Sequence, residues 1–403
     1  MLACIIDENA SVSIAVRREA SIAAAVSKRK EQKMSKREIH YTVIGAGHGG
    51  KATAAHLALM GYPVTLYNRT DAHIAALRAR GGIQLTFANG YEAEGFGKLA
   101  RVTSDIQEAL CDAEVIMVVV PASAHRDIAV LAAPHLRDGQ IIVLNPGRTC
   151  GAIEFRHTLH QQNCPADVIV AEAGTFIYAS RSNGPAQAHI FRVKDAVPLA
   201  ALPAARTAHV LDVLAPAYPQ FIDGQNVLHT SLNNMGAIFH PALTLLNAGR
   251  IESTHGDYQF YIDGVTPSVA RVLHVLDRER VTVAAALGIR ATTAREWLQM
   301  AYDARGSSLR EAIHNNPGYH GIKAPANLEH RYIFEDVPMS LVPIAALGQQ
   351  YGVQVRGMEA IIRLACIVHR TDYGRTGRTL DKLGLKGLSV SELTAYVMEG
   401  HMP

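Results

Sequence analysis

Cysteine is scarce in this sequence, and its cysteines lie far apart. Only 5 of the 403 residues are cysteine, and no two of them form a Cys-x-x-Cys or another close pair. Isolated thiols of this kind are typical of reduced cysteines, and they exclude the disulfide framework of a small secreted domain. We therefore expect a cytoplasmic protein.

Two further absences exclude other classes of protein. No apolar run approaches the ~20 residues that a membrane-spanning helix needs, so we expect no membrane partner. The formal net charge is only +3. The one basic cluster, between residues 28 and 37, is typical of a solvated tail, so we expect no nucleic-acid partner.

Histidine is abundant, but its spacing shows no metal-binding pattern. The sequence has 19 histidines and no His-Glu-x-x-His motif. His157 and His160 form the closest helical pair, and isolated pairs of this kind are more often solvated than metal-bound. We expect no metal site.

The first 33 residues look separate from the rest of the chain. Asp7 and Glu8 interrupt the apolar start, so the hydrophobic region of a signal peptide is lacking. We interpret residues 1–33 as a mobile extension, and Met34 as a normal start for the folded protein. The remaining length suffices for two domains, and the composition, 48% apolar and 19% charged, is typical of a soluble globular protein.

The most informative segment present is Tyr41 to Gly50, which reads YTVIGAGHGG. An apolar strand leads into Gly45-x-Gly47-x-x-Gly50, and a helical stretch follows over residues 51–60. This order of strand, glycine turn and helix is the dinucleotide-binding fingerprint. Gly45 allows the tight turn, Gly47 lets a pyrophosphate approach, and Gly50 lets the helix pack on the strand. His48 and Gly49 belong to the same coenzyme-binding turn, where the helix start favours phosphate.

The end of the second predicted strand, residues 63–67, indicates which nucleotide binds. NAD-specific folds usually place Asp or Glu at this point, to accept from the ribose 2′-hydroxyl. Here the sequence has Asn68, Arg69 and Thr70. No carboxylate repels a 2′-phosphate, and Arg69 can pair with it while its two neighbours donate. The sequence therefore favours NADP, with NAD as the alternative.

Alternating strands and helices over residues 34–220 predict an α/β fold, a Rossmann domain with a doubly wound parallel sheet. Predicted buried strands at 114–120, 140–144 and 168–171 end at Pro121, Asn145 and Glu172. Strand ends of this kind line the coenzyme pocket, so Pro121 is a candidate contact. From residue 221 to 403 long helical stretches dominate, such as 268–287, 292–304 and 358–371. We expect a mainly α-helical substrate domain there, with a cleft between the two domains.

Two segments of the second domain carry residues suited to chemistry. Pro241 disfavours the α conformation at His240, so we expect this imidazole at a helix break. Arg331, Glu335 and Asp336 lie close together in the other segment. Asp336 could merely cap the following helix, and Arg331 could merely pair with Glu335. Residue types and spacing alone leave these alternatives open.

The order of these motifs resembles the octopine/nopaline dehydrogenase family, the opine dehydrogenases. The resemblance covers nearly all of residues 39–390 and is closest to the bacterial N-(1-carboxyethyl)-amino-acid dehydrogenases. Its markers are Gly45–Gly50, Val120–Ala122, Leu144–Gly147, Asn226–Leu232, His240–Pro241, Gly264–Ser268, Arg331–Asp336 and Thr376–Leu380.

The resemblance implies a reaction and a set of residues. An α-keto acid, commonly pyruvate, and the amino group of an amino acid would be condensed and reduced with NAD(P)H to an N-(carboxyalkyl) amino acid. By motif, His240 matches the catalytic histidine, Asp336 its partner, and Arg331 an arginine that holds a substrate carboxylate. Gly236 stands where much of the family has an asparagine. Asn234 (or Asn233) is therefore the candidate that would supply the hydrogen bond of that asparagine to the substrate.

Two other interpretations stay open. A two-domain reductase could reduce a 2-keto acid or ketone with NADPH and no amine. Such enzymes would be expected to use lysines in the second domain, and Lys323 is the only lysine between residues 195 and 381. A nucleotide-binding sensor without turnover is the third interpretation, which the His240, Arg331 and Asp336 set argues against. A homodimer is compatible with each of them.

Overall fold

The structure is a computed structural model that describes residues 39–88 and 94–401. The predicted extension at residues 1–33 lies outside the described residues. The elements from β1 onward belong to one unit, which begins at His40.

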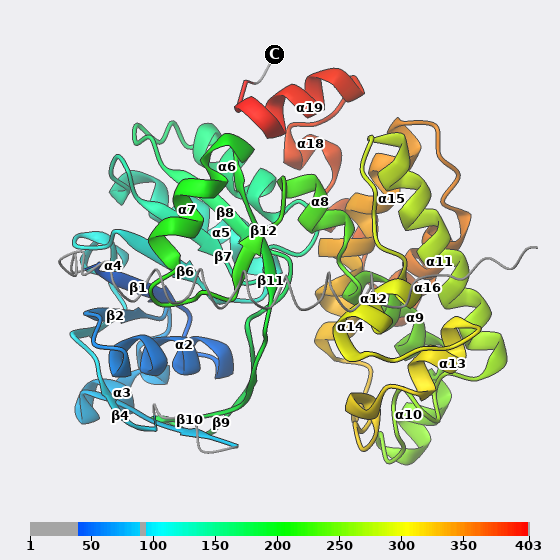
Figure 1. The fold of residues 1–403 in the computed structure, drawn as a ribbon, viewed down its shortest axis with the longest axis horizontal. Helices are drawn as coiled ribbons and strands as arrows, with labels where there is room; N and C mark the ends of the chain where they lie inside the picture. The colour runs from blue at the N-terminus through cyan, green and yellow to red at the C-terminus, as the bar shows by residue number, and fades with distance from the viewer. Residues whose placement is uncertain (1–38, 89–93, 402–403) are drawn as a thin grey trace, which may run out of the picture. The chain divides into compact units, whose positions relative to one another are not determined.

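A mostly parallel sheet of eight strands organises the first half of this unit (Figure 1). Its spatial order is β12-β11-β8-β7-β6-β1-β2-β5, and only the β11–β8 pair is antiparallel. The strands are β1 (Tyr41–Ile44), β2 (Val64–Tyr67), β5 (Arg101–Thr103), β6 (Val115–Val118), β7 (Ile141–Leu144), β8 (Ile169–Ala173), β11 (Val197–Leu202) and β12 (Phe221–Asp223).

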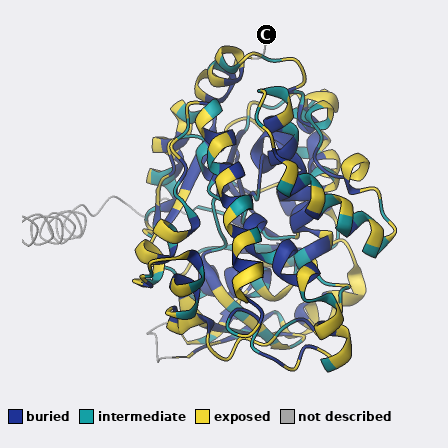
Figure 2. Ribbon diagram, turned by 90° about the vertical axis from the view of Figure 1, so that its right-hand side faces the viewer, coloured by how far each residue is buried: buried dark blue, intermediate teal, exposed yellow. Residues whose placement is uncertain are grey.

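The central strands are apolar along their whole length because helices cover the sheet. All four residues of β1, β6 and β7 are buried. Figure 2 shows helices with buried residues along one side and exposed residues along the other. Helices of this half are α2 (His48–Leu59), α3 (Ala75–Arg80), α4 (Ile106–Leu110), α5 (His125–Ala132), α6 (Gly151–Gln161) and α7 (Thr207–Leu214). β1 has β2 on one side and β6 on the other, so the topological switch point lies at its carboxyl end. The predicted doubly wound fold is confirmed.

A second sheet of four strands was not predicted. Its order is β4 (Gly95–Lys98), β3 (Gly82–Phe87), β10 (Gln187–Val193) and β9 (Tyr178–Gly184). Strand β3 pairs with β10 and with β4, and not with the main sheet. Along β9, exposed residues alternate with less exposed ones, as expected for a strand with one covered face, and this sheet packs on α2.

Helices dominate after β12. They are α8 (Val227–Leu232), α9 (Gly236–Leu246), α10 (Ala248–Thr254), α11 (Pro267–Ala286), α12 (Ala294–Tyr302), α13 (Leu309–His314), α14 (Arg331–Phe334), the π-helical turn η6 (Val337–Leu341), α15 (Val342–Gln350), α16 (Arg356–His369), α17 (Tyr373–Thr376), α18 (Leu380–Leu383) and α19 (Val390–Glu399). The long helix α11 starts where Thr266 caps the backbone N–H of Val269 and Pro267 takes the first helical position. The predicted helix at 268–287 is confirmed.

The last helices return to the first half of the unit. α18 packs against α6, and α19 packs against β11 (Figure 1). The C-terminal segment therefore joins both halves, although it follows the helical part in sequence.

Candidate functional site

The glycine turn after β1 leaves room for a ligand. Gly45 has φ +113°, and a Cβ on Gly50 would overlap the carbonyl oxygen of Gly45, so both positions require glycine. A Cβ on Gly47 would meet nothing within 4 Å, so the space beside it is open. Helix α2 begins at His48 without a capping side chain, which leaves its first backbone N–H groups uncapped. These features fit a dinucleotide pyrophosphate.

The second sheet braces this turn. A Cβ on Gly49 would lie 2.8 Å from the ring of Phe176, just before β9. The backbone N–H of Ser182 on β9 donates to Nδ1 of His48 at 2.9 Å. Burial, then Lys51, Arg181 and Arg331, lowers the pKa of His48, so the imidazole is neutral with its proton on Nε2.

The end of β2 divides its three polar side chains between two tasks. Oδ1 of Asn68 accepts from the backbone N–H of Ala46 at 3.2 Å, and its Nδ2 donates to the carbonyl of Thr70 at 3.0 Å. Asn68 therefore holds the glycine turn rather than offering free donors. Arg69 and Thr70 are exposed, and the Arg69 guanidinium has no polar partner among residues 39–88 and 94–401.

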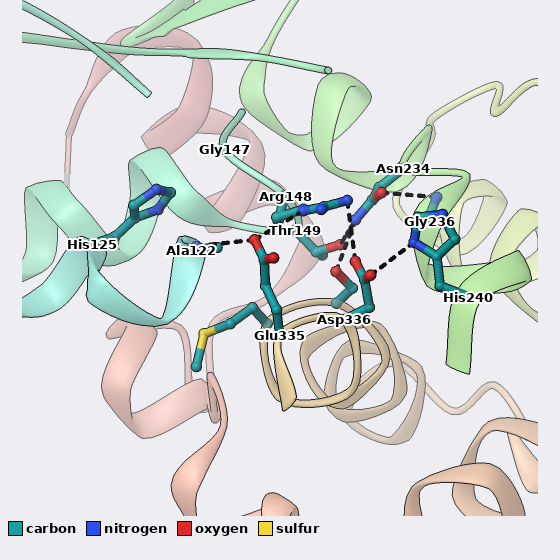
Figure 3. A network of polar contacts seen from close by, with 12 residues as sticks. Ala122, His125, Gly147, Arg148, Thr149, Asn234, Gly236, His240, Glu335 and Asp336 are labelled. Atoms are coloured by element: carbon teal, nitrogen blue, oxygen red, sulfur yellow. Dashed lines mark hydrogen bonds and ion pairs between the residues drawn. The ribbon is translucent and has the colours of Figure 1, made fainter. Parts of the chain in front are cut away.

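His240, Asp336 and Arg148 form the central polar network (Figure 3). Nδ1 of His240, on α9, lies 2.8 Å from Oδ2 of Asp336, between α14 and η6. Nη1 of Arg148, in the loop after β7, lies 3.1 Å from the other carboxylate oxygen. The His240 ring stacks on Tyr332 with centroids 4.0 Å apart. No described residue bonds Nε2, so this nitrogen is free for a reacting group.

Asp336 is fully buried, and its charge depends on these neighbours. Burial by itself raises the pKa of this carboxyl, but Arg148, and after it His240, outweigh burial and lower the pKa. Glu335 is oriented by other groups. Its Oε1 accepts from the backbone N–H of Ala122 at 3.1 Å and from Nε of Arg148 at 3.4 Å. The strand ends after β6 and β7 are thereby joined to α14.

One expectation about these residues is wrong, and the structure excludes two interpretations that the sequence left open. His240 does not lie at a helix break, because α9 continues through Pro241. Packing of this apolar helix against α11 and α16 outweighs the lost backbone hydrogen bond. Asp336 makes no capping hydrogen bond, since one of its oxygens faces His240 and the other faces Arg148. Arg331 does not pair with Glu335, whose partner is Arg148.

The remaining predicted residues lie around this network. Arg331 begins α14, is exposed, and has no ion pair within the described part of the chain, while its charge acts on His48. Pro121 follows β6, and the neighbouring Val119 carbonyl lies against Gly45. Asn234 is buried, donates to Oγ of Ser340 at 2.9 Å and accepts from the backbone N–H of Gly236 at 3.1 Å. Asn234 thus supports the start of α9 and does not bond His240.

Sequence reasoning missed two cations. Arg148 directly follows the Asn145-Pro146-Gly147 strand end, and the rule that ligands gather at such ends could have found it. Lys194, after β10, is half-buried and donates to Oγ1 of Thr175 at 2.7 Å. Burial, then Arg148 and Arg192, lowers the pKa of Lys194 to about 8. No motif marks Lys194, which lies just before the stretch between residues 195 and 381 that holds Lys323 as its only lysine.

Residues 39–88 and 94–401 contain no group of three or more His, Cys, Asp or Glu side chains placed to hold a metal ion. Within the same ranges, no helix combines the length and apolar character needed to cross a membrane.

Comparison with known proteins identifies the family. The chain is 39% identical over 357 residues to an opine dehydrogenase of Arthrobacter sp. (strain 1C), covering 89% of this chain and 98% of the relative. The chain belongs to the opine dehydrogenase family. It is accordingly an NAD(P)-dependent oxidoreductase, as the sequence predicted.

Other matches agree with this family. Residues 223–369 match the α-helical domain of NAD/NADP octopine/nopaline dehydrogenases, and residues 40–152 match the N-terminus of NAD-dependent glycerol-3-phosphate dehydrogenases. Vitopine synthase of Allorhizobium ampelinum is 27% identical to this chain, and the match covers 71% of this chain and 79% of the relative.

Solved structures show the same fold. Octopine dehydrogenase in complex with NADH and agmatine superposes with a TM-score of 0.76 at 20% identity, covering 91% of this chain and 99% of the other. NADP+-bound yersinopine dehydrogenase has a TM-score of 0.67 at 16% identity, with 90% and 98% covered.

Proposed function

We propose that this opine dehydrogenase condenses an α-keto acid, pyruvate, with the amino group of an amino acid and reduces the product to an N-(carboxyalkyl) amino acid. The observation that carries the proposal is the His240–Asp336–Arg148 network beside the strand ends next to the glycine turn. Structures of octopine dehydrogenase hold L-arginine in one case and pyruvate in another, which supports this pair of substrate classes.

The reaction needs protons at a defined place. The amine attacks the carbonyl carbon, water leaves, and the resulting C=N bond gains a hydride at carbon and a proton at nitrogen. NAD(P)H, when bound on the glycine turn, supplies the hydride. We assign His240 as the proton donor: Asp336 accepts from Nδ1, so Nε2 faces the substrate, and the carboxylate stabilises the imidazolium. The reverse reaction uses the same groups.

Arg331 is the proposed anchor for a substrate carboxylate. Its guanidinium is exposed and has no ion pair among the described residues, so it is free to form a bidentate contact. Such a contact fixes the keto acid relative to His240, since α14 also carries Tyr332, whose ring stacks on the imidazole. Pro121 and the glycine turn are the proposed coenzyme contacts on the opposite side.

We propose NADP as the preferred coenzyme. The supporting observation is that Arg69 is exposed and unpaired at the end of β2, where a 2′-phosphate would lie. Asn68 is occupied with Ala46, so Arg69 and Thr70 carry the proposed preference.

The rival function is reduction of a keto acid or ketone without an amine. A grid of keto acids against amino acids separates the two, with NADPH loss followed by absorbance and the product identified by mass spectrometry. The proposed function requires NADPH loss that depends on both substrates and a product with the mass of the reduced condensate. Equal rates with and without amino acid, and a hydroxy acid as product, would establish the rival.

Three further proposals concern the domains, the assembly and the location of the protein. The expected boundary between a coenzyme domain at 34–220 and a helical domain at 221–403 falls just before β12, which pairs with β11 in the main sheet, so we place the boundary after residue 223. Limited proteolysis tests this boundary. A homodimer is the expected assembly, which sedimentation measures. The four described cysteines are free, which supports a cytoplasmic location, to be tested by fractionation.

A further inference from the structure

Arg148 is a buried arginine held between two carboxylates. It follows the cis Asn145–Pro146 bond and Gly147, has φ +60°, and its side chain is only 11% exposed. Nη1 lies 3.1 Å from Oδ1 of Asp336, and Nε lies 3.4 Å from Oε1 of Glu335 (Figure 3). A buried guanidinium in this position can direct both carboxylates.

The two oxygens of Asp336 have different partners. Oδ2 faces Nδ1 of His240, and Oδ1 faces Arg148. The contact between Arg148 and Oδ1 is an ion pair and not a hydrogen bond. Because the carboxylate is planar, a positive charge on the Oδ1 side restrains the direction in which Oδ2 meets the imidazole. Asp336 makes no capping bond in η6, so its orientation depends on these two partners.

Gly236, the first residue of α9, leaves the room that Arg148 occupies. A Cβ on Gly236 would lie 2.8 Å from Nη1 of Arg148, closer than real side-chain contacts. It would also lie 3.2 Å from Oδ1 of Asn234 and 3.3 Å from Nδ1 of His240, which are tight but tolerable distances. The severest conflict is therefore with the guanidinium.

We propose that Arg148 is a positioning residue that holds the Asp336 carboxylate in line with His240, and that the missing side chain at Gly236 is required to keep Arg148 there. The proposal deepens the proposed function, on which its kinetic part rests. Arg148 acts on His240 through Asp336 and joins the loop after β7 to the helices that carry the proposed catalytic pair.

Other charged and titratable groups surround the pair. Arg331 also lowers the pKa of Asp336, but it is exposed and its effect is smaller than that of Arg148. The two arginines differ in their effect on the pKa of Asp336 because water screens the charge of the exposed Arg331. Among the described residues, the groups that interact electrostatically with Asp336 or Arg148 are His125, Lys194, His240, Tyr261, His330, Arg331, Tyr332 and Glu335.

Arg148→Met tests the positioning role through a pH profile. Without the guanidinium, burial dominates and the pKa of Asp336 rises. Asp336 then becomes protonated at a higher pH as the pH is lowered. The acid limb of the pH profile of kcat/KM should therefore move to higher pH. A misplaced imidazole should also lower kcat on the order of 10²-fold. Arg148→Lys keeps the positive charge but loses the planar guanidinium. This variant should restore the position of the acid limb more fully than it restores kcat. An unmoved acid limb in Arg148→Met would overturn the proposal.

A double-mutant cycle tests the link to Gly236. Gly236→Ala should push the guanidinium away and reproduce the shifted limb with Arg148 still present. In the Arg148→Met background the same alanine should have little further effect, because its main conflict is gone. Gly249→Ala on α10, where an added Cβ meets nothing within 4 Å, is the matched control. If the effects of the two changes were independent and additive, the absence of a side chain at Gly236 would not be required to keep Arg148 in place.

A measurement without turnover separates this proposal from the proposed function. Nitrogen NMR of the His240 ring follows its bond to Asp336 as the pH falls. The acid-side change should occur at higher pH in Arg148→Met and in Gly236→Ala than in the unaltered protein. This result would stand even if no keto acid and amine pair were turned over. Unchanged ring signals in both variants would exclude the positioning role, whatever the reaction.

Discussion

At the scale of single residues, His240 is held at one ring nitrogen and one ring face. Asp336 takes Nδ1, Tyr332 stacks on the ring, and Nε2 has no described partner. The side chain is 17% exposed, so it is ordered by the protein yet accessible from one side. A general acid needs this combination of fixed tautomer and reachable second nitrogen.

Removing the His240 imidazole tests its proposed role. His240→Ala should lower kcat by roughly 10²- to 10⁴-fold, the usual contribution of general acid catalysis. Coenzyme binding, measured by fluorescence titration, should be retained, because His240 lies on the helical side. His274→Ala, an exposed histidine on α11, is the control and should keep the wild-type rate. A near-normal kcat in His240→Ala would remove this residue from the mechanism.

The planar shape of the Arg331 guanidinium, in addition to its charge, is expected to matter for binding the keto acid. Arg331→Lys keeps the charge and loses the planar fork, so KM for the keto acid should rise while coenzyme affinity stays constant. Steady-state kinetics with the keto acid varied at saturating amine and coenzyme measure this. The carboxylate role would be excluded by an unaltered KM.

Arg69 determines the proposed coenzyme preference. A charge-assisted contact contributes about 1.5–3 kcal/mol, so Arg69→Ala should weaken NADPH binding by roughly 10- to 100-fold. NADH lacks the 2′-phosphate, and its affinity should barely change. Parallel titrations of both coenzymes test this difference. Equal losses for both would show that Arg69 does not read the phosphate.

At the scale of elements, the glycine turn works only with support from the second sheet. β9 contributes the backbone N–H that fixes His48, and Phe176 just before β9 packs against Gly49. Helix α2 lies against both sheets, so its start is held from two sides. These contacts restrain the turn, and restraint in advance of binding lowers the entropic cost of ordering a ligand site.

Two glycines of this turn should respond differently to alanine. Gly47→Ala places its methyl group in open space, so the melting temperature should stay unchanged while the dissociation constant for NADPH rises. Gly50→Ala collides with the Gly45 carbonyl, so it should lower both stability and affinity. Calorimetry and coenzyme titration of the two variants give the comparison. Normal affinity in Gly47→Ala would place the pyrophosphate elsewhere.

At the scale of the whole molecule, buried polar groups join the halves. Arg378, between α17 and α18, has no exposed surface and lies 2.7 Å from Glu154 of α6. It also donates to the carbonyls of Gly147, Thr149 and Ala122. Glu172 at the end of β8 accepts from Oγ1 of Thr230 at 2.6 Å. The strand ends that carry the site are therefore held by segments from distant parts of the sequence.

Loss of Arg378 should destabilise the molecule strongly. Arg378→Met leaves Glu154 as an unpaired buried charge, which typically costs about 3–5 kcal/mol of unfolding free energy. Urea denaturation measures the change. Lys386→Met, which removes an exposed pair with Asp381, is the control and should have little effect. A loss in Arg378→Met no larger than in this control would show that the buried pair does not stabilise the fold.

The accuracy of the sequence predictions depended on the distance between interacting residues. Strands β1, β6 and β7, the glycine turn and helix α11 follow from apolar runs, Gly45 and the Thr266-Pro267 start, all of which are local signals. The candidate pair His240 and Asp336 came from a family resemblance, since 96 positions separate them and spacing alone left other interpretations open.

The amino-acid sequence by itself determined where strands and helices form and where a nucleotide can approach, because dihedral preference and apolar periodicity act within a few residues. Tertiary structure decided the rest. It continued α9 through Pro241, paired β3 with β10, and brought Arg148 to Glu335 across 187 positions. Burial of a charge is compensated only by a partner in space, and no local pattern specifies which distant residue that partner is.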